Sequence, residues 1–388
     1  MRAFRPIVLA AALVPALAGA ASGPAALVNP LIGTTNGGNV FPGAVVPFGM
    51  LQFSPEASPL PGKKAPIAAP GGYEYRADAI RGFSLTNVEG WGCAGGSGDV
   101  PIMPVTDEIT VSPSTDFRHA YASKFSHANE TAKAGHYHVA LDNGVAVDLT
   151  AALHSGAARF AFPAGKPANV LVRASDSEAG SEKASVTVDK AATRVTGEVT
   201  SGNFCGYINE ADRRSYYTLY FVAEFDQPFA YTGTWQDTGV QKGGMHAEGG
   251  TGYGEKGFPA TGKGSGAWVG FAKGTGAVNV RVGISYVSLA NAQANLDAEN
   301  PRGTTFETLR DKAADAWNAR LSHIDIEGGT PDQRTVFYTA LYHALMHPNV
   351  FSDVNGEYRG FDNAVHRVAG SQKAQYANFS GWDVYRSQ

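Results

Sequence analysis

Three observations predict a mainly β chain, an antiparallel β-sandwich that gives way to helices near its C-terminal end. From Val28 to about Ala290, short apolar or alternating runs are separated by Gly, Pro, Asn and Asp, as in strands joined by turns. A hairpin pattern surrounds Asn143-Gly144. From Thr304 onwards the apolar residues recur at helical spacing. The 388 residues suffice for about two domains.

The N-terminal residues 1–20 have the form of a secretory signal peptide. Arg2 and Arg5 precede an apolar run from Ile7 to Leu17, and Ala18-Gly19-Ala20 fits the small-residue cleavage rule. The run is too short to span a bilayer, and no later segment approaches 18 uncharged apolar residues. We therefore expect export to the periplasm or the extracellular space, a β-sandwich domain over 21–300 and helices over 301–388.

Charge and cysteine content narrow the choice of partners. The chain carries 31 basic and 35 acidic residues and has no basic cluster, which argues against nucleic acid and anionic membrane as partners. A neutral or small partner is expected, and the oligomeric state is open. Cys93 and Cys205 could form one disulfide or stay as two buried thiols, and two cysteines alone cannot form a zinc cage.

Several strands can be placed within the β region. His136–Leu141 and Val145–Leu149 alternate around the Asn143-Gly144 turn and predict a hairpin. Tyr216–Phe225 and Val278–Ser288 are rich in Val, Tyr, Phe and Ile, as expected of sandwich strands.

The segment from Gly233 to Gly266 has glycine at nearly every third residue and is too polar to be buried throughout. It predicts a long loop or a ragged hairpin. Its Trp235, His246 and Tyr253 could reach a neighbouring site, although a mobile surface loop is the simpler interpretation.

Two helices follow the β region. Thr304-x-x-Glu307 forms a capping-box pattern, and a helix to about His323 should bury one face, made of Phe306, Leu309, Ala313, Trp317 and Leu321. Thr330-Pro331-Asp332-Gln333 begins a second helix that Pro348 ends. Its predicted buried stripe consists of Val336, Phe337, Ala340, Leu341, Ala344 and Leu345.

The stretch from Arg81 to Pro104 is the most distinctive in the chain. It holds Trp91, Cys93 and six glycines, so it cannot form a regular helix or strand. Trp91 lies between Glu89 and Asp99, a combination of a flat apolar face and hydroxyl acceptors that suits a sugar ring. A purely structural loop under a sheet explains the composition equally well.

Two other motifs lack the neighbouring residues that their usual functions require. Gly90–Gly95 matches GxGxxG, but Pro101 and further glycines follow where a helix should begin. His343 and His347 have metal-binding spacing, yet Ala344 stands where a zinc protease needs Glu, so partly buried helix histidines are expected.

Two further patterns give no catalytic site. The segment after Asp353 lacks the Gly and Glu of a calcium loop, so Asn355-Gly356 is interpreted as a hairpin turn. No GxSxG elbow is present and neither cysteine has a nearby histidine, so nothing local marks a nucleophile. The chain also stops just after Trp382 and Asp383, which resemble the opening of another helix, and we interpret it as a fragment.

Several motifs, in order along the whole mature chain, resemble those of glycoside hydrolase family 92, a family of α-mannosidases. They are Val28–Gly33, Phe41–Met50, Arg81–Ser84, Gly90–Cys93, Gly98–Pro101, Asn203–Gly206, Phe351–Asp353 and Phe379–Arg386.

The resemblance implies a β-sandwich packed on an (α/α)6 barrel, with the active site between them and calcium bound to mannose hydroxyls. It also implies an exo-acting, inverting enzyme on α-mannoside glycans, expected to be α-1,2-linked. Inversion needs two carboxyl groups about 6.5–9.5 Å apart. The acid, the base and the metal ligands are expected beyond residue 388.

Two elements carry over from the family to positions in this chain. Trp382-Asp383 corresponds to the Trp-Asp pair that lines the mannose subsite, unless Trp382 is simply barrel core. The loop with Trp91, Gly92 and Cys93 corresponds to the part of the sandwich that reaches the leaving-group side, where Trp91 would contact the aglycone sugar. The alternative is a non-catalytic carbohydrate-binding sandwich protein.

Overall fold

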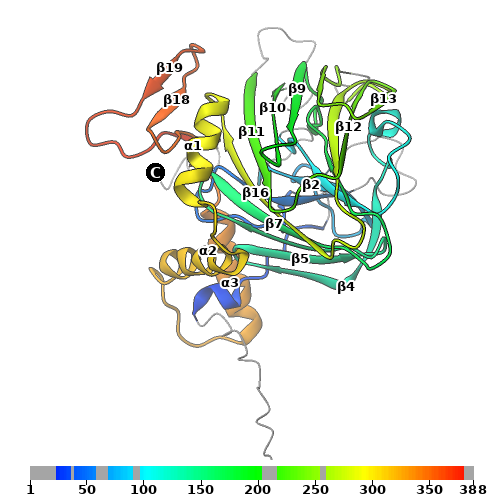
Figure 1. The fold of residues 1–388 in the computed structure, drawn as a ribbon. Coiled ribbons are helices and arrows are strands. Elements are labelled where there is room, and N and C mark those ends of the chain that lie inside the picture. The colour runs from blue at the N-terminus through cyan, green and yellow to red at the C-terminus, as the bar shows by residue number, and fades with distance from the viewer. Residues whose placement is uncertain are drawn as a thin grey trace, which may run out of the picture.

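In the computed structural model a large antiparallel sheet carries helices at one end (Figure 1). The structure describes residues 23–35, 39–57, 69–90, 97–202, 216–253 and 259–379. The predicted signal peptide lies outside these ranges. The predicted mainly β, antiparallel character is confirmed.

Sixteen strands form one hydrogen-bonded sheet, whose two halves meet where β2 pairs with β4. The first half consists of β1 (Ser54–Ala57), β2 (Ala79–Ser84), β3 (Ile102–Val105), β8 (Asn169–Val172), β12 (Tyr231–Gln236), β13 (Gly239–Lys242) and β15 (Ser265–Gly270). The second half consists of β4 (Ser123–Lys133), β5 (His136–Leu141), β6 (Ala146–Ala151), β7 (Ser155–Ala161), β9 (Lys183–Asp189), β10 (Arg194–Ser201), β11 (Tyr217–Phe225), β14 (His246–Glu248) and β16 (Ala277–Ser285).

The two halves share one apolar core. Leu171 and Trp268 of the first half belong to the same buried cluster as Val186 and Leu219 of the second. Burial of each large apolar side chain contributes about 1.5–3 kcal/mol, so the sheet folds over and the two halves face each other. The layers of the predicted sandwich are therefore parts of one continuous sheet.

The predicted Asn143-Gly144 hairpin is confirmed. β5 and β6 pair in register, with Tyr137 opposite Leu149, and Gly144 has φ of 95° in the turn. Glycine takes this left-handed conformation without steric cost, which explains the residue at the turn.

Within the glycine-rich segment from Gly233 to Gly266, β12 and β13 form a hairpin, β14 pairs with β9, and Trp235 belongs to the core. Residues 254–258 of the segment lie outside the described ranges. A Cβ on Gly266 would lie 2.2 Å from the ring of Trp235, and one on Gly233 would lie 1.9 Å from the ring of Trp268. Glycine is thus required because an indole from the paired strand covers it. Trp235 is 1% exposed, so the idea that it reaches a neighbouring site is wrong.

Helix α2 (Phe306–Leu321) buries the five predicted side chains, Phe306, Leu309, Ala313, Trp317 and Leu321. Its N-cap is Thr305 rather than Thr304, and the Thr305 hydroxyl accepts from the Thr308 amide. Glu307 does not complete a capping box: its Oε1 lies 2.6 Å from Nη1 of Arg159 on β7. Glu307 therefore pairs with a strand residue instead of capping its own helix.

Helix α3 (Pro331–Ala344) begins at the predicted Thr330–Gln333 start, where Thr330 and Gln333 form a capping box. The predicted buried stripe is right only in part: Phe337, Leu341 and Leu345 are half-buried and pack against the core, whereas Val336, Ala340 and Ala344 are exposed. Val336 is 57% exposed, whereas Tyr338, Thr339 and Tyr342 are buried. The Tyr342 ring lies 4.2 Å from the ring of Trp317. Large aromatic side chains bury more area than Val or Ala, so packing on α2 selects the tyrosine face.

Helix α1 (Leu289–Glu299) was not predicted. It begins with Ser288 as N-cap and packs Ala292 and Leu296 on Val222 of β11. With so few large apolar residues its sequence shows little helical periodicity. No helix within the described ranges is long and apolar enough to cross a membrane.

The remaining elements are short. They are η1 (Pro24–Leu27), η2 (Pro113–Asp116), β17 (Asn349–Val350) paired with β20 (Tyr376–Ala377), and β18 (Glu357–Arg359) paired with β19 (Val365–Arg367). Figure 1 shows α2, α3 and the blue η1 gathered at one end of the sheet, with the red β18–β19 hairpin beside α1. That residues 301–388 open an (α/α)6 barrel stays a prediction.

Candidate substrate site between the sheet and the helices

All five predicted substrate-binding residues lie outside the described ranges. Trp91, Gly92 and Cys93 fall within 91–96, and Trp382 and Asp383 within 380–388. Cys205 lies outside them as well, so the predicted disulfide alternative stays open. The described residues on either side of the 91–96 loop do show where the loop enters and leaves the sheet.

Glu89, two residues before Trp91, anchors the entry of the loop to helix α3. Its Oε1 lies 2.6 Å from Nδ1 of His343, and its side chain is almost fully buried. The other ring nitrogen of His343, Nε2, lies 3.0 Å from the carbonyl oxygen of Ile32. Both ring nitrogens lie beside acceptor oxygens, an arrangement that favours the protonated imidazolium.

Burial and the contact between the two side chains shift the pKa values of both Glu89 and His343. Burial raises the pKa of Glu89, while the hydrogen bond and charge of His343 oppose that rise. Burial alone would lower the pKa of His343, but the hydrogen bond and charge of Glu89, with the Ile32 carbonyl, raise it overall. The shift of the His343 pKa favours its charged form, while burial opposes the charged form of Glu89, and the two side chains meet across the junction.

His347, one turn further along, contacts the same glutamate in the opposite protonation state. Its Nε2 accepts from the backbone N–H of Glu89 at 3.2 Å, and Nδ1 lies 3.2 Å from Oδ1 of Asn349. Burial lowers the pKa of His347 to about 4, although the Asn349 contact opposes this, so the ring is neutral at pH 7. A neutral ring is what an acceptor nitrogen requires.

Both histidines are partly buried, as expected, but only His343 lies on a helix, because α3 ends at Ala344 and His347 follows it. The ring nitrogens of His343 and His347 are already engaged by the protein. Within the described ranges, no group of three or more His, Cys, Asp or Glu side chains is placed to hold a metal ion.

The segment Phe41–Met50 joins the helices to the sheet at the same place. The Phe48 amide donates to the Leu345 carbonyl at 2.9 Å, and the Phe48 carbonyl accepts from Val350 at 2.8 Å. The indole Nε1 of Trp317 donates to the Val45 carbonyl at 2.6 Å. One segment therefore fixes α2, α3 and β17 relative to the sheet, and it does so beside Glu89.

The exit of the loop is held by the interior of the β region. The Ser97 carbonyl accepts from the Glu178 amide at 2.9 Å, and the Gly98 amide donates to the Thr86 carbonyl at 2.8 Å. Asp99 is fully buried, and its Oδ2 accepts from Thr86 at 2.6 Å and from Tyr217 at 2.7 Å. Asp99 and Glu89 are both buried, and each has an oxygen that contacts a protein side chain, so both carboxylates help to hold the fold.

Beneath this exit lies a buried group of charged side chains. Nη2 of Arg81 lies 3.2 Å from Oε2 of Glu56, and its Nη1 lies 3.6 Å from Oδ2 of Asp176. No donor among the described residues hydrogen-bonds to either carboxyl oxygen of Glu178. A hydrogen bond between Glu178 and Glu56 requires that one of the two carboxyl groups is protonated. Burial raises the pKa of Glu56 to about 7 and that of Glu178 further, because the Glu56 charge adds to the desolvation of Glu178. Both effects favour the protonated form of Glu178.

Asp353 is a second structural carboxylate near the helices. Its Oδ2 accepts from Ser285 at 2.7 Å and Asn291 at 2.8 Å, and its Oδ1 accepts from Asn295 at 2.7 Å. The Gly356 amide donates to its carbonyl at 2.8 Å, which confirms the predicted turn at Asn355-Gly356. The carboxylate holds the segment after α3 against α1 and β16.

Two family models cover nearly the whole described chain. The glycosyl hydrolase family 92 N-terminal domain matches residues 27–285, and the family 92 catalytic domain matches residues 291–388.

The chain belongs to glycoside hydrolase family 92.

Solved structures of this family share its fold. The family GH92 α-mannosidase BT3965 from Bacteroides thetaiotaomicron is 29% identical over 94% of this chain, with a TM-score of 0.79. The family GH92 inverting mannosidase BT2199 from the same organism is 25% identical over 94% of this chain, with a TM-score of 0.75. An uncharacterized secreted glycosidase of Arthroderma benhamiae is 25% identical over 343 residues, or 84% of this chain.

The chain spans less than half the length of each of these relatives. It covers 46% of BT3965, 45% of BT2199 and 42% of the Arthroderma protein. The catalytic-domain match begins at residue 291, so the Glu89–His343 pair joins the two matched domains of the family 92 chain.

Sequence reasoning did not find that pair. The i, i+4 spacing placed His343 and His347 on one helix face. Their common partner Glu89 is more than 250 residues away in sequence, and no local pattern connects them. The Glu56–Arg81–Glu178 group left no signal either, because the alternation that predicts a strand does not report which charged residues face inward.

Proposed function

We propose that this protein contributes to an exported, exo-acting α-mannosidase that releases mannose with inversion, and that it prefers α-1,2 linkages. Membership of family 92 over both matched domains supports glycoside hydrolysis. The solved relatives are named as α-mannosidases, one of them inverting, and a further relative is named as secreted.

The observation that carries this proposal is the position of Glu89 and Gly90, the two described residues that precede Trp91. Glu89 and Gly90 are fixed by His343, by His347 and by the Asn39 carbonyl, which accepts from the Gly90 amide at 2.7 Å. Trp91 follows directly, so the loop begins where the sheet meets the helices. An aromatic residue there suits one face of an aglycone sugar.

Trp382 and Asp383 would line the mannose side of the same site. An indole shields the sugar ring and a carboxylate accepts from two hydroxyl groups. An inverting reaction also needs an acid and a base about 6.5–9.5 Å apart, with a water molecule between the base and the anomeric carbon.

Calcium belongs to the proposal only through the family resemblance. Calcium prefers oxygen ligands, and the cis 2-OH and 3-OH of mannose could chelate it. The described residues offer no metal-binding cluster, so we derive no step that uses the ion.

The proposal is tested with the secreted full-length protein on an aryl α-mannoside and on α-1,2-, α-1,3- and α-1,6-linked mannobiose, with and without a calcium chelator. We expect mannose release, fastest from the α-1,2 disaccharide, with β-mannose as the first product by NMR. Binding of mannosides without any hydrolysis would support the alternative, a non-catalytic carbohydrate-binding protein. Retention of configuration would contradict inversion.

A further inference from the structure

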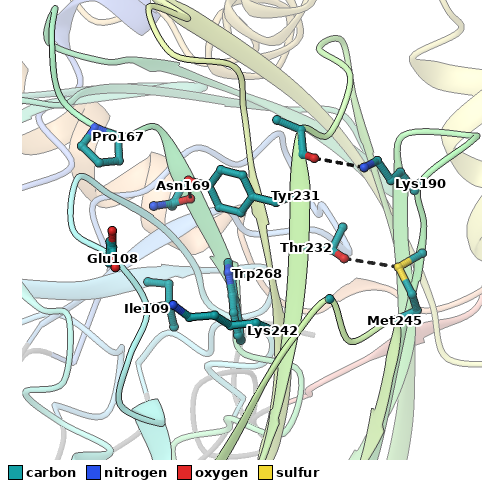
Figure 2. Close-up of a pocket in the computed structure, with 12 residues that line it drawn as sticks. Glu108, Ile109, Pro167, Asn169, Lys190, Tyr231, Thr232, Lys242, Met245 and Trp268 are labelled. Carbon is teal, nitrogen blue, oxygen red and sulfur yellow. Dashed lines mark hydrogen bonds between the residues drawn. The ribbon is translucent and has the colours of Figure 1, made fainter.

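A cleft of about 640 Å³ is lined by residues of β8, β12, β13 and β15 and of the neighbouring segments (Figure 2). Figure 1 shows β12 and β13 at the end of the sheet away from α2 and α3. Tyr231, Trp268, Asn169, Glu108 and Lys242 are among its lining residues. Its volume falls within the range of small-molecule sites, about 300–1,000 Å³.

Tyr231 offers the cleft a fixed aromatic face. A Cβ on Gly270, its partner across β12 and β15, would lie 2.1 Å from the tyrosine ring, so the ring lies directly over the glycine backbone. The Tyr231 hydroxyl donates to Oδ1 of Asn169 at 2.7 Å. With one face against Gly270 and its tip held, the ring is still 44% exposed.

The same strand pair repeats this arrangement deeper in the cleft. Trp268 lies over Gly233, its partner two register pairs along from Tyr231 and Gly270, and therefore on the same side of the sheet as Tyr231. Trp268 is almost fully buried, so it forms the floor while Tyr231 forms an exposed platform. Figure 2 shows the two rings projecting from the β12–β15 pair, with Asn169 beside Tyr231.

Polar side chains of both charges stand around this platform. The exposed side chains of Glu108 and Lys242 have no hydrogen-bond or ion-pair partner among the described residues. Lys190 Nζ donates to the Ala230 carbonyl at 3.0 Å, so this ammonium group already has a partner within the protein. An aromatic face with one free carboxylate and one free ammonium group suits a neutral ligand with many hydroxyl groups better than an ion.

The geometry points to a second saccharide site at this cleft, separate from the junction that holds the 91–96 loop. Tyr231 stacks on a neutral sugar ring, and Glu108 and Lys242 bind hydroxyl groups on either side of it. That the sugar is a mannoside rests on the proposed function, whereas the stacking does not. Such a site would keep the protein on a polymeric glycan while the junction acts on chain ends.

The test is affinity electrophoresis of the full-length protein in gels with yeast mannan, alongside titration with mannotriose. We expect Tyr231→Ala to weaken binding about five- to thirty-fold, as loss of an aromatic stacking contact does. Tyr231→Phe keeps the ring and should retain most of the binding. Tyr358→Ala, on the β18–β19 hairpin, is the matched control and should leave binding unchanged.

Hydrolysis of a soluble aryl mannoside, measured on the same variants, separates this site from the proposed activity. We expect Tyr231→Ala to leave that hydrolysis and the melting temperature nearly unchanged. Mannan retention that is absent, or equal in the wild type and Tyr231→Ala, would overturn the second site even if the protein is an active mannosidase. Retention that raised salt abolishes would also overturn it, because the ligand would then be held by charge. Tyr231-dependent retention by an inactive protein would instead contradict the proposed function alone.

Discussion

His343 and Glu89 form a buried ion pair, with Nδ1 and Oε1 2.6 Å apart, that joins helix α3 to the residue two positions before Trp91. His347 accepts from the amide of the same glutamate. The residue that precedes the proposed aglycone loop therefore contacts two histidines, His343 on α3 and His347 just after the helix.

The first prediction concerns the cost of breaking this pair. His343→Leu should destabilise the protein by about 3–5 kcal/mol, because it leaves the Glu89 carboxylate buried without its partner. The double variant His343→Leu/Glu89→Leu should recover part of that loss. Urea unfolding of the single and double variants measures both.

The matched control is His366→Leu, which removes an exposed pair with Asp362 of similar length, 2.9 Å. Solvent screens exposed pairs of this kind, so this variant should change the stability little. An equal loss of stability in His343→Leu and His366→Leu would show that the buried pair stabilises the fold no more than the exposed one.

The second prediction concerns acid stability. The folded-state pKa of His347 is about 4, below its ordinary value of 6.5, so the folded protein takes up this proton less readily than the unfolded chain. Above about pH 6.5 the neutral His347 ring makes its full contribution to the free energy of unfolding. That contribution, about 3 kcal/mol, is lost as the pH falls towards 4. Melting temperatures from pH 4 to 8 should fall less on the acid side in His347→Gln. An unchanged acid slope in that variant would exclude His347 as the cause.

The third prediction concerns alkaline stability. Since the folded-state pKa of Glu178 is raised, its contribution is present below the ordinary pKa and is lost as pH rises through the folded value. Glu178→Gln should remove this loss and flatten the decline of stability as the pH rises above about 4.5. The exposed Glu182→Gln is the control and should follow the wild type. If both variants follow the wild type, Glu178 does not hold a proton in the fold.

Local patterns predicted much of the fold. The Asn143-Gly144 hairpin and the buried face of α2 follow from period and turn chemistry that neighbouring residues determine. The failures came where distant residues decide. Trp235 is buried because Gly266 lies opposite it, and Val336 is exposed because Tyr338 and Tyr342 pack on α2. The partners of Glu89 likewise depend on the assembled junction, although its neighbour Trp91 was recognisable from the motif.

The fourth prediction separates a structural carboxylate from a sugar-binding one. Asp353→Ala should lower stability by several kcal/mol, because the buried donors of Ser285, Asn291 and Asn295 each lose an acceptor at about 1–3 kcal/mol. Turnover per folded molecule should change little. Asp383→Ala should instead cut turnover by one to two decades, about 1.5–3 kcal/mol, with a smaller effect on melting. Small, equal effects on turnover from both would remove the support for Asp383 as a sugar ligand.

The fifth prediction, for Trp91→Ala, tests the proposed aglycone loop most directly. Hydrolysis of α-1,2-mannobiose depends on aglycone contacts in the transition state, whereas an aryl mannoside with a good leaving group depends on them much less. The measurement is kcat/KM on both substrates, beside a thermal melt of each protein. We predict that Trp91→Ala lowers kcat/KM on the disaccharide about five- to thirty-fold more than on the aryl mannoside, with little change in melting temperature. An unchanged substrate ratio with a large loss of stability would mean that the loop only supports the fold, and would contradict the site at the junction.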